Sequence, residues 1–349
     1  MFLDSSPDRW GRVLMMRREA QRARAEARPE RRLLESDYLL GVHDGHRMGA
    51  LRFRTLPGGP FLDDDDQLAS PPWTSLRELE AASRALERDD AEDDPDYAKW
   101  LRMLIAPGGS LGGARPKASV SDERGLHWIA KFPSRNDRED VGAWEGVVHT
   151  LAGRAGILTA PALTRAFGGE QRTFLTQRFD RTEKDQRLHF ASALTLLQRT
   201  DGDDASNGAS YLELAEVIMQ FGADPDRDLE QLWRRIVFFI CVANTDDHLM
   251  NHGFMLTPLG WTLAPAYDMN PNPQGAGLTL NISESDNALD LGLAMQVAPY
   301  FRVSPAHAKA IVGEVMDAVG AWKQVAAKHE LGNAAQQRMA GAFAVRSSP

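Results

Sequence analysis

Cysteine is nearly absent from this chain: Cys241 is the only one among 349 residues. A single cysteine can build neither a disulfide framework nor a cysteine-based zinc site. Because Cys241 stands inside the strongly apolar run 232–242, we expect a small buried residue rather than a reactive thiol.

Long apolar runs and a surplus of positive charge are also lacking. No stretch approaches the roughly 18 apolar residues of a membrane-spanning helix, and residues 1–7 lack the charged and apolar regions of a signal peptide. The formal net charge of −9 argues against a large basic surface for nucleic acid. We therefore expect a cytoplasmic protein without a membrane partner.

The composition that remains is typical of a globular protein, with 43% hydrophobic and 26% charged residues. The length exceeds what one hydrophobic core usually serves, so two domains are expected. No internal repeat is visible, and a strand-rich lobe followed by a helical lobe is the simplest architecture.

The amino-terminal segment is rich in arginine, and a helix is predicted over 8–27. Its basic residues and those just after it are Arg9, Arg12, Arg17, Arg18, Arg22, Arg24, Arg28, Arg31 and Arg32. They indicate either a solvated helix face or a patch for nucleic acid or an acidic partner. Farther along, Ser75 followed by Glu78 predicts a capping box at the start of a helix that ends near residue 88.

Between 106 and 178 the pattern changes to strands. Residues 106–117 form a glycine-rich loop, which we expect to lie between two strands. Strands are predicted over 118–121, 126–132 and 173–179. A helix over 141–155 is predicted to bury Trp144, Val147, Val148 and Leu151. Beyond 180 the predicted helices are 190–199, 211–221, 229–242 and 305–328.

The pair Asp246 and Asn251 carries the most information about function. The two residues stand five apart, directly after the apolar run 232–242. Kinase catalytic loops use this spacing to place a hydroxyl-activating carboxylate beside a magnesium-binding amide. Asp268 follows after a predicted hairpin and could supply a second metal ligand. The chain is therefore interpreted first as a phosphotransferase.

Other residues strengthen this interpretation by their order along the chain. The glycine loop could hold phosphate through its amides or could serve only as a turn. Lys131 follows the loop by one hairpin, where a kinase places its phosphate-binding lysine, although it could be an ordinary strand lysine. Glu145 could point from its helix toward Lys131 or could be a solvated surface residue. Asp246 itself could merely cap a turn, and His248 could be a structural histidine.

A metal-dependent hydrolase is an alternative from another class of enzyme. Carboxylates and imidazoles suit such metals, and the candidate ligands would be Asp246, Asp247, His248, His252 and Asp268. This alternative leaves the glycine loop and Lys131 without a role.

Five segments together resemble the HipA family of bacterial toxin serine/threonine kinases. They are SLGGARPK (110–117), IAKFP (129–133), QRFDR (177–181), TDDHLMN (245–251) and YD (267–268), and they occur in the family's order. The resemblance extends roughly over residues 4–320. It implies an α+β, bilobal protein-kinase-like fold. The strand-rich N-lobe would be 1–178, with a family-specific region over 1–100 and a nucleotide-binding region over 101–178. The helical C-lobe would be 179–349.

The resemblance also implies roles for individual residues, with ATP and Mg²⁺ as cofactors. Asp246 would be the catalytic base, Asn251 and Asp268 would bind Mg²⁺, and Lys131 would contact the nucleotide phosphates. The phosphate loop would be Gly112, Gly113, Ala114, Arg115, Pro116 and Lys117, with Ser110 as an autophosphorylation site. The nucleotide would also meet the backbone of Gln177, Arg178 and Phe179, and the residues His248, Asn251 and Tyr267. Glu145 matches the family's helix glutamate.

Partners and departures follow from the same resemblance. The substrate would be a serine or threonine of another protein, with an aminoacyl-tRNA synthetase as a candidate. The expected partner is a DNA-binding antitoxin, through which nucleic acid would be met only indirectly. The resemblance implies that the family's small amino-terminal subdomain is missing here, so that either a separate small protein supplies it or the chain is a truncated copy. Pro116 removes one amide donor from the loop. A catalytically silent partner of the antitoxin is the remaining alternative.

Overall fold

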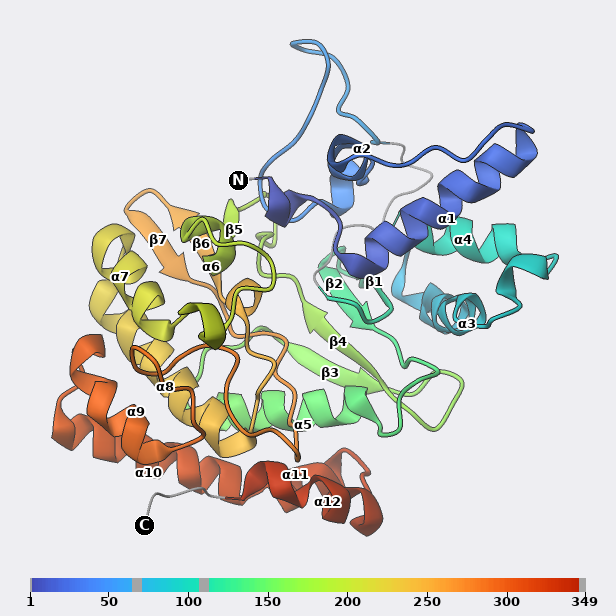
Figure 1. Ribbon diagram of the computed structural model, residues 1–349. Helices are drawn as coiled ribbons and strands as arrows, with labels where there is room; N and C mark the ends of the chain where they lie inside the picture. The colour runs from blue at the N-terminus through green and yellow to red at the C-terminus, as the bar shows by residue number, and fades with distance from the viewer. Residues whose placement is uncertain (1, 65–70, 107–112, 345–349) are drawn as a thin grey trace. The chain divides into compact units, whose positions relative to one another are not determined.

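The computed structural model describes residues 2–64, 71–106 and 113–344 (Figure 1). The chain divides into two compact units. The first consists of Met1–Gly142 and Pro161–Phe190, and the second of Ala143–Ala160 and Ala191–Pro349. The first unit therefore continues past the expected boundary at 178, and the second includes a segment from the middle of the chain.

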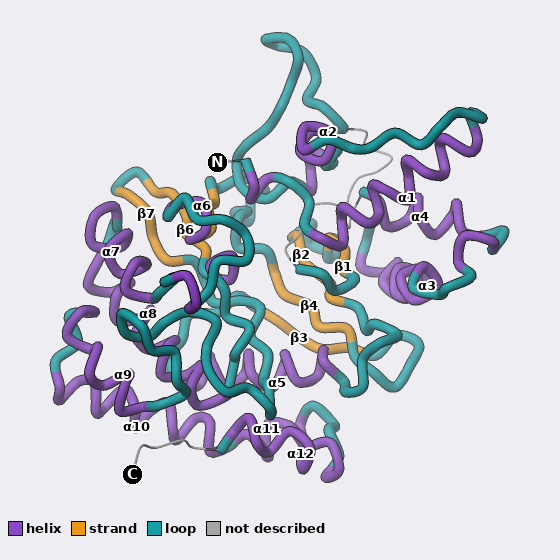
Figure 2. Tube along the Cα trace, viewed as in Figure 1, coloured by secondary structure: helices purple, strands orange, loops and turns teal. Residues whose placement is uncertain are grey.

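The first unit combines helices with one antiparallel sheet (Figure 2). Its helices are α1 (Arg9–Ala25), α2 (Glu35–Leu40), α3 (Leu76–Leu86) and α4 (Tyr97–Ile105). Its strands are β1 (Lys117–Ser121), β2 (His127–Lys131), β3 (Ala162–Arg165) and β4 (Thr173–Gln177), hydrogen-bonded in the order β1-β2-β4-β3. The helices α1, α3 and α4 pack with the sheet around one apolar core that includes Leu14, Leu79, Leu104, Val120 and Ala130.

The sheet register places two lysines opposite each other. In the β1–β2 hairpin, Lys117 is the partner of Lys131, so both lie at the same end of the sheet. The segment before β1 is α4, so the expectation that the glycine-rich loop lies between two strands is wrong. The loop instead follows a helix and leads into β1.

The second unit is mainly helical. Its helices are α5 (Val141–Arg154, whose first two residues belong to the first unit), α6 (Ala193–Leu196), α7 (Tyr211–Phe221), α8 (Pro225–Val242), α9 (Leu291–Val297), α10 (Pro305–Gly320), α11 (Trp322–Lys328) and α12 (Asn333–Met339). The strands β5 (Phe190–Ser192), β6 (Gly253–Thr257) and β7 (Gly260–Leu263) form a small sheet in the order β5-β6-β7. In Figure 1, α10 runs alongside α8, the helix at the centre of this core.

The helix α8 shows how the apolar run produces a buried element. Asp224 caps its start by accepting a hydrogen bond from the Arg227 amide, and Pro225 occupies the first turn. All residues from Leu232 to Val242 are buried. Cys241 is among them, and burial raises the pKa of its thiol to about 12, as expected for an inert residue.

Three predicted elements differ from the structure. Ser75 makes no side-chain cap, because the 3₁₀ turn Trp73–Ser75 already gives its backbone a helical conformation. Residues 190–192 form β5 rather than a helix, and α6 starts only after Ser192, whose hydroxyl accepts a hydrogen bond from the Thr195 amide. The predicted helix 305–328 is divided at Ala321 into α10 and α11.

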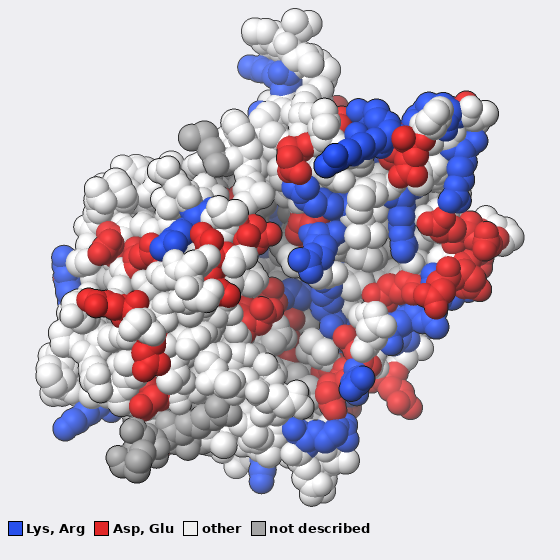
Figure 3. Space-filling view, in the orientation of Figure 1, with Lys and Arg blue, Asp and Glu red and all other residues white. Residues whose placement is uncertain are grey.

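The arginines of α1 act within the first unit. Arg12 pairs with Glu35 at 2.6 Å, and Arg24 pairs with Glu92 at 2.6 Å. Arg17 donates to the carbonyl of Leu86 at 2.6 Å. In the space-filling view, basic side chains over α1 are interspersed with acidic ones (Figure 3). Part of the arginine-rich face therefore links α1 to neighbouring elements rather than facing solvent alone.

No helix within 2–64, 71–106 and 113–344 is both long and apolar enough to cross a membrane.

Candidate active site

The candidate catalytic loop, residues 243–252, begins where α8 ends and leads into β6. Ala243 takes a left-handed backbone conformation, with φ of 47°, and the Asn244 amide donates back to the carbonyl of Phe239 at 3.0 Å. The buried Asn244 side chain accepts a hydrogen bond from the Asn270 amide at 2.9 Å. This bond joins the loop to the segment that carries Asp268.

The structure brings Asp246 and Asn251 together. The side-chain amide of Asn251 donates through Nδ2 to the carbonyl oxygen of Asp246 at 2.9 Å. The His248 amide donates to the same carbonyl at 3.2 Å, and the Asn251 amide donates to the carbonyl of His248 at 2.8 Å. These bonds close a compact loop that ends in the 3₁₀ turn Leu249–Asn251.

The Asp246 side chain is exposed at the edge of this loop. Partial burial of its carboxyl raises its pKa, and the negative charges of Asp268 and Asp247 raise it further, whereas the charge of His248 lowers it. A carboxylate with a raised pKa is a stronger base than an ordinary aspartate, and it still accepts hydrogen bonds from solvent-side groups.

Asp268 follows β7 and lies near the catalytic loop. Its backbone has a φ of 55°, which is uncommon for a residue other than glycine. One of its carboxylate oxygens accepts a hydrogen bond from the Asn270 side chain at 3.2 Å. The neighbouring Tyr267 hydroxyl donates to the carbonyl of Met250 at 2.6 Å. The predicted residues Asp268 and Tyr267 are thus both held beside the loop.

The residues present fit a magnesium ion. Because Nδ2 of Asn251 donates to Asp246, the amide oxygen of Asn251 is the atom left to meet a cation. The carboxylates of Asp246 and Asp268 are close enough for the charge of one to raise the pKa of the other. A divalent cation relieves this repulsion, and Mg²⁺ prefers oxygen ligands of this kind.

The ligand set of a metal-dependent hydrolase is not assembled. Asp247 is 1% exposed and points into the core, where it accepts hydrogen bonds from Tyr211 and His252. Among the described residues, no group of three or more histidine, cysteine or acidic side chains is placed to hold a metal. The alternative based on Asp246, Asp247, His248, His252 and Asp268 therefore loses its geometric basis.

The first unit holds the remaining predicted residues. Ser110 and Gly112 lie outside the described residues. Gly113 and Ala114 are exposed, and Gly113 has a φ of +97°, a conformation that favours glycine. The carbonyl of Pro116 accepts a hydrogen bond from the Phe132 amide at 2.9 Å, which ties the end of the loop to β2.

The charged side chains of the loop are engaged within the first unit. Arg115 forms two hydrogen bonds with Asp137, at 3.0 and 2.6 Å. Lys117 is the first residue of β1 rather than a loop residue, and its Nζ pairs with the buried carboxylate of Asp8 at 3.0 Å. Lys131 is buried at the end of β2, with its Nζ 6.0 Å from the ring centroid of Phe174.

Glu145 is 2% exposed within α5, so the interpretation as a solvated surface residue is wrong. Glu145 belongs to the second compact unit and Lys131 to the first, and their pairing stays a prediction.

The segment 177–181 has a structural role that sequence reasoning missed. The amides of Gln177 and Arg178 donate to the carbonyls of Pro161 and His127, so they serve the sheet, and the Phe179 ring packs against Phe190. The Arg178 side chain is fully buried and donates twice to Asp180, at 2.9 and 2.8 Å. Three charged residues, Arg178, Asp180 and Arg181, follow directly after a strand, and this sequence pattern could have indicated a buried network of ion pairs.

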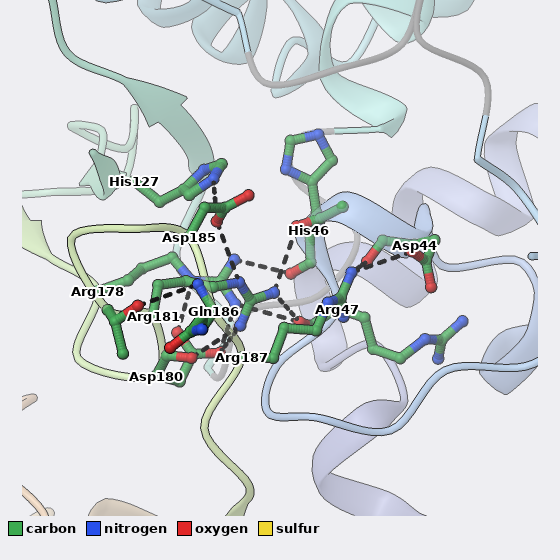
Figure 4. A network of polar contacts seen from close by, with 12 residues as sticks. Asp44, His46, Arg47, His127, Arg178, Asp180, Arg181, Asp185, Gln186 and Arg187 are labelled. Carbon is green, nitrogen blue, oxygen red and sulfur yellow. Dashed lines mark hydrogen bonds and ion pairs between the residues drawn. The ribbon is translucent and has the colours of Figure 1, made fainter. Parts of the chain in front are cut away.

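Figure 4 shows the network that these side chains form with residues 44–49. Arg181 donates to Asp180 at 2.6 Å and to the carbonyl of Arg47 at 2.8 Å. Asp180 also accepts a hydrogen bond from the Gly49 amide at 2.8 Å. Burial alone would raise the pKa of Asp180, but the two guanidinium groups hold it at about 2. The network locks the segment after β4 to the amino-terminal region.

With this geometry established, comparison with known proteins identifies the family. Residues 109–322 match the family of the HipA-like C-terminal domain. This stretch is more than half of the chain. The chain belongs to the HipA family. The family membership that the five sequence segments indicated is thereby confirmed. The matched residues include Lys131, Asp246, Asn251 and Asp268.

A solved structure supports the fold. The chain is similar to HipA of the Shewanella oneidensis MR-1 toxin–antitoxin system, solved with HipB and its operator DNA, with a TM-score of 0.54 and 17% identity over 67% of this chain. The match spans 63% of the length of the Shewanella HipA. A Helicobacter pylori proinflammatory kinase, CtkA, matches with a TM-score of 0.43 and 11% identity, over 65% of this chain and 92% of its own. No curated protein matches the sequence.

The expected α+β, kinase-like fold is therefore confirmed for this HipA-family chain. At 17% identity the similarity to the Shewanella HipA establishes the shared fold alone.

Proposed function

We propose that this HipA-family chain is an Mg²⁺·ATP-dependent protein kinase that phosphorylates serine or threonine. One observation carries the proposal. The structure joins Asp246 to Asn251 by a 2.9 Å hydrogen bond, with Asp268 close enough to perturb the Asp246 carboxyl. A base beside two oxygen ligands for a cation is the arrangement that phosphoryl transfer requires.

Each residue has a task in the proposed reaction. Asp246 accepts a hydrogen bond from the acceptor hydroxyl and orients its oxygen. It takes the hydroxyl proton as the new P–O bond forms to the γ-phosphorus, while the bond from the γ-phosphorus to the bridging oxygen breaks and ADP leaves. Asn251 and Asp268 would hold Mg²⁺, which, when bound, neutralises the charge that spreads over the transferred phosphoryl group. Lys131 would contact the nucleotide phosphates, and the amides of the glycine-rich loop would donate hydrogen bonds to them.

The proposal extends to partners and regulation. The Shewanella HipA was solved with HipB and operator DNA, which supports a DNA-binding antitoxin as a partner of this chain. An aminoacyl-tRNA synthetase is the proposed class of substrate, and Ser110 the proposed site of autophosphorylation.

The test compares the wild-type chain with Asp246→Asn, which keeps the shape of the side chain but removes the base. With labelled ATP and Mg²⁺, the wild type should become labelled, and Asp246→Asn should be slower by about 10²–10⁴-fold. Its affinity for ATP should change by no more than about twofold, because a base acts mainly in the transition state.

A matched control is Asp317→Asn, since Asp317 is an exposed aspartate on α10 in the same unit. This variant should label at the wild-type rate. Transfer that persists in a folded Asp246→Asn protein would remove the assignment of Asp246, and an unlabelled wild type would support the catalytically silent alternative.

A further inference from the structure

The catalytic loop contains a second pair of residues with the same spacing as the first. Asp246 and Asn251 are five apart, and the residues that follow each of them, Asp247 and His252, are five apart as well. Asp247 and His252 are hydrogen-bonded to each other, with His252 Nε2 2.7 Å from an Asp247 carboxylate oxygen. Both side chains are buried, at 1% and 0% exposed.

A third side chain completes this arrangement. The Tyr211 hydroxyl, from α7, donates to the same oxygen of Asp247 at 2.6 Å. The rings of Tyr211 and His252 meet edge to face, with 5.6 Å between centroids, and the ring of Phe239 lies 6.3 Å from His252. Burial and the negative charge of Asp247 raise the pKa of Tyr211 well above its ordinary value, so the phenol keeps its proton and remains a donor.

Positive charge also approaches Asp247 from α8. Arg235 is buried there and interacts electrostatically with the Asp247 carboxylate. One of its guanidinium nitrogens donates to the carbonyl of Ala264 at 2.5 Å, just after β7. The carboxylate of Asp247 is therefore surrounded by two hydrogen-bond donors and one positive charge, which fix its direction.

We propose that Asp247 and His252 form an internal clasp that sets the separation of Asp246 and Asn251. The clasp rests on the proposed function, because it gives a purpose to the spacing of the two outer residues. Asp247 and His252 are positioning residues: they act through their chain neighbours and touch neither substrate nor cation.

The geometry explains how the clasp would work. Asp247 directly follows Asp246 and His252 directly follows Asn251, so a hydrogen bond between the side chains of Asp247 and His252 limits how far the backbone at Asp246 and at Asn251 can move apart. The hydrogen bond between His252 Nε2 and the Asp247 carboxylate fixes the orientation of the imidazole ring. The backbone of His252 is held separately, since its carbonyl accepts a hydrogen bond from the Ala193 amide at 2.8 Å.

The clasp joins segments of the second unit that are distant in sequence. It connects α7, the catalytic loop and the start of β6 through one carboxylate oxygen. In the low dielectric of a core such hydrogen bonds are strong and tolerate little displacement. Replacing the carboxylate by an amide, as in Asp247→Asn, would remove the negative charge and leave one neutral oxygen to accept from two buried donors. Both hydrogen bonds would weaken, and the loop would then relax around Asp246 and Asn251.

The test uses Asp247→Asn, with Tyr211→Phe as a milder variant that removes one hydroxyl. In phosphoryl transfer by Asp247→Asn, kcat should fall at least tenfold, and the Mg²⁺ concentration for half-maximal rate should rise several-fold. Tyr211→Phe should shift both quantities in the same direction by less. All rates are compared at a temperature where circular dichroism shows each variant folded.

Asp228→Asn is the matched control. Asp228 is also a buried aspartate of the second unit, 1% exposed, and it accepts a hydrogen bond from the Leu263 amide at 2.8 Å. Its loss should lower the melting temperature while kcat and the Mg²⁺ requirement stay within twofold of wild type. If Asp247→Asn behaves in the same way as Asp228→Asn, Asp247 is a stability residue only and the clasp is overturned.

Hydrogen exchange separates failure of the clasp from failure of the proposed function. In the absence of nucleotide, the amides of 245–252 should exchange at least tenfold faster in Asp247→Asn than in wild type, and Asp228→Asn should leave them unchanged. If the wild type transfers no phosphate, the proposed function fails, and the clasp is decided by this exchange alone. Unchanged exchange in Asp247→Asn would overturn the clasp whatever the activity.

Discussion

Asp246 and Asp247 are neighbours in opposite environments. The side chain of Asp246 is exposed and senses the charge of Asp268, whereas Asp247 is 1% exposed and accepts hydrogen bonds from Tyr211 and His252. The same residue type thus provides an exposed carboxylate, the proposed base, at Asp246 and a buried hydrogen-bond acceptor at Asp247. Burial and neighbouring charge, rather than the chemistry of the side chain, distinguish the two.

The pH dependence of the proposed reaction follows from the environment of Asp246. The base must be ionised, so kcat/KM should fall as the pH drops through the raised pKa of Asp246. The charge of His248 lowers that pKa. His248→Gln should therefore move the acid limb of the profile to higher pH. His307→Gln, which alters an exposed histidine paired with Glu230, should leave the limb in place. A limb that moves to lower pH in His248→Gln would contradict the role of Asp246.

Asp180 tests the buried network of the first unit. Asp180→Asn leaves the guanidinium groups of Arg178 and Arg181 buried without their carboxylate, so the free energy of unfolding should fall by about 3–5 kcal/mol. Asp185→Asn, at an ion pair whose aspartate is 67% exposed, should cost less than about 1 kcal/mol. Urea unfolding of the whole chain measures both. Equal small losses would show that the network adds no stability.

Asp180 also makes the stability of the chain depend on pH. Its folded pKa, about 2, is below the ordinary value, so the unfolded chain binds the proton more readily. The stabilisation is fully present above the ordinary pKa of aspartate and is lost as the pH falls toward 2. Asp180→Asn should lose this contribution to the acid dependence of stability.

Among the secondary-structure elements, local sequence patterns predicted long helices better than they predicted the ends of helices or the short strands. The helix α7 was predicted with its observed bounds, because Ser210 caps it and its apolar residues recur at helical spacing. The strand β5 was missed because its three residues are all buried and its partner β6 lies far away in the chain. The predicted capping box at Ser75 is wrong because the preceding 3₁₀ turn gives Ser75 a helical backbone conformation.

Two glycines of α5 give a prediction at this scale. A Cβ on Gly142 would lie 2.0 Å from the carbonyl oxygen of Arg172, which precedes β4, so Gly142→Ala should cost at least about 1–3 kcal/mol of stability. Gly153 is exposed, and its Cβ would meet only Thr159 at 3.8 Å. Gly153→Ala should stabilise the chain by up to about 1 kcal/mol, because alanine is the better helix former. Thermal unfolding measures both variants. A lower melting temperature for Gly142→Ala and a higher one for Gly153→Ala would confirm the close packing at the start of α5.

In the molecule as a whole, the sequence pattern indicated the order of the candidate site residues, but it did not indicate the buried hydrogen bonds behind the loop that carries Asp246 and Asn251. The spacing of Asp246 and Asn251 is local and therefore visible in the sequence. The bond between Tyr211 and Asp247 joins residues 36 positions apart, and the assignment of 143–160 to the second unit depends on tertiary packing. Neither has a local pattern from which it could be predicted.

The proposed reaction is the transfer of the terminal phosphoryl group of ATP to a hydroxyl. The most direct measurement incubates the chain with Mg²⁺ and ATP labelled either at the γ- or at the α-phosphate, followed by analysis of the labelled amino acids. A serine/threonine kinase gives label from γ-labelled ATP alone, recovered as phosphoserine or phosphothreonine. Label from α-labelled ATP would show nucleotide transfer instead. That result, or no label from either nucleotide, would refute the proposed kinase activity.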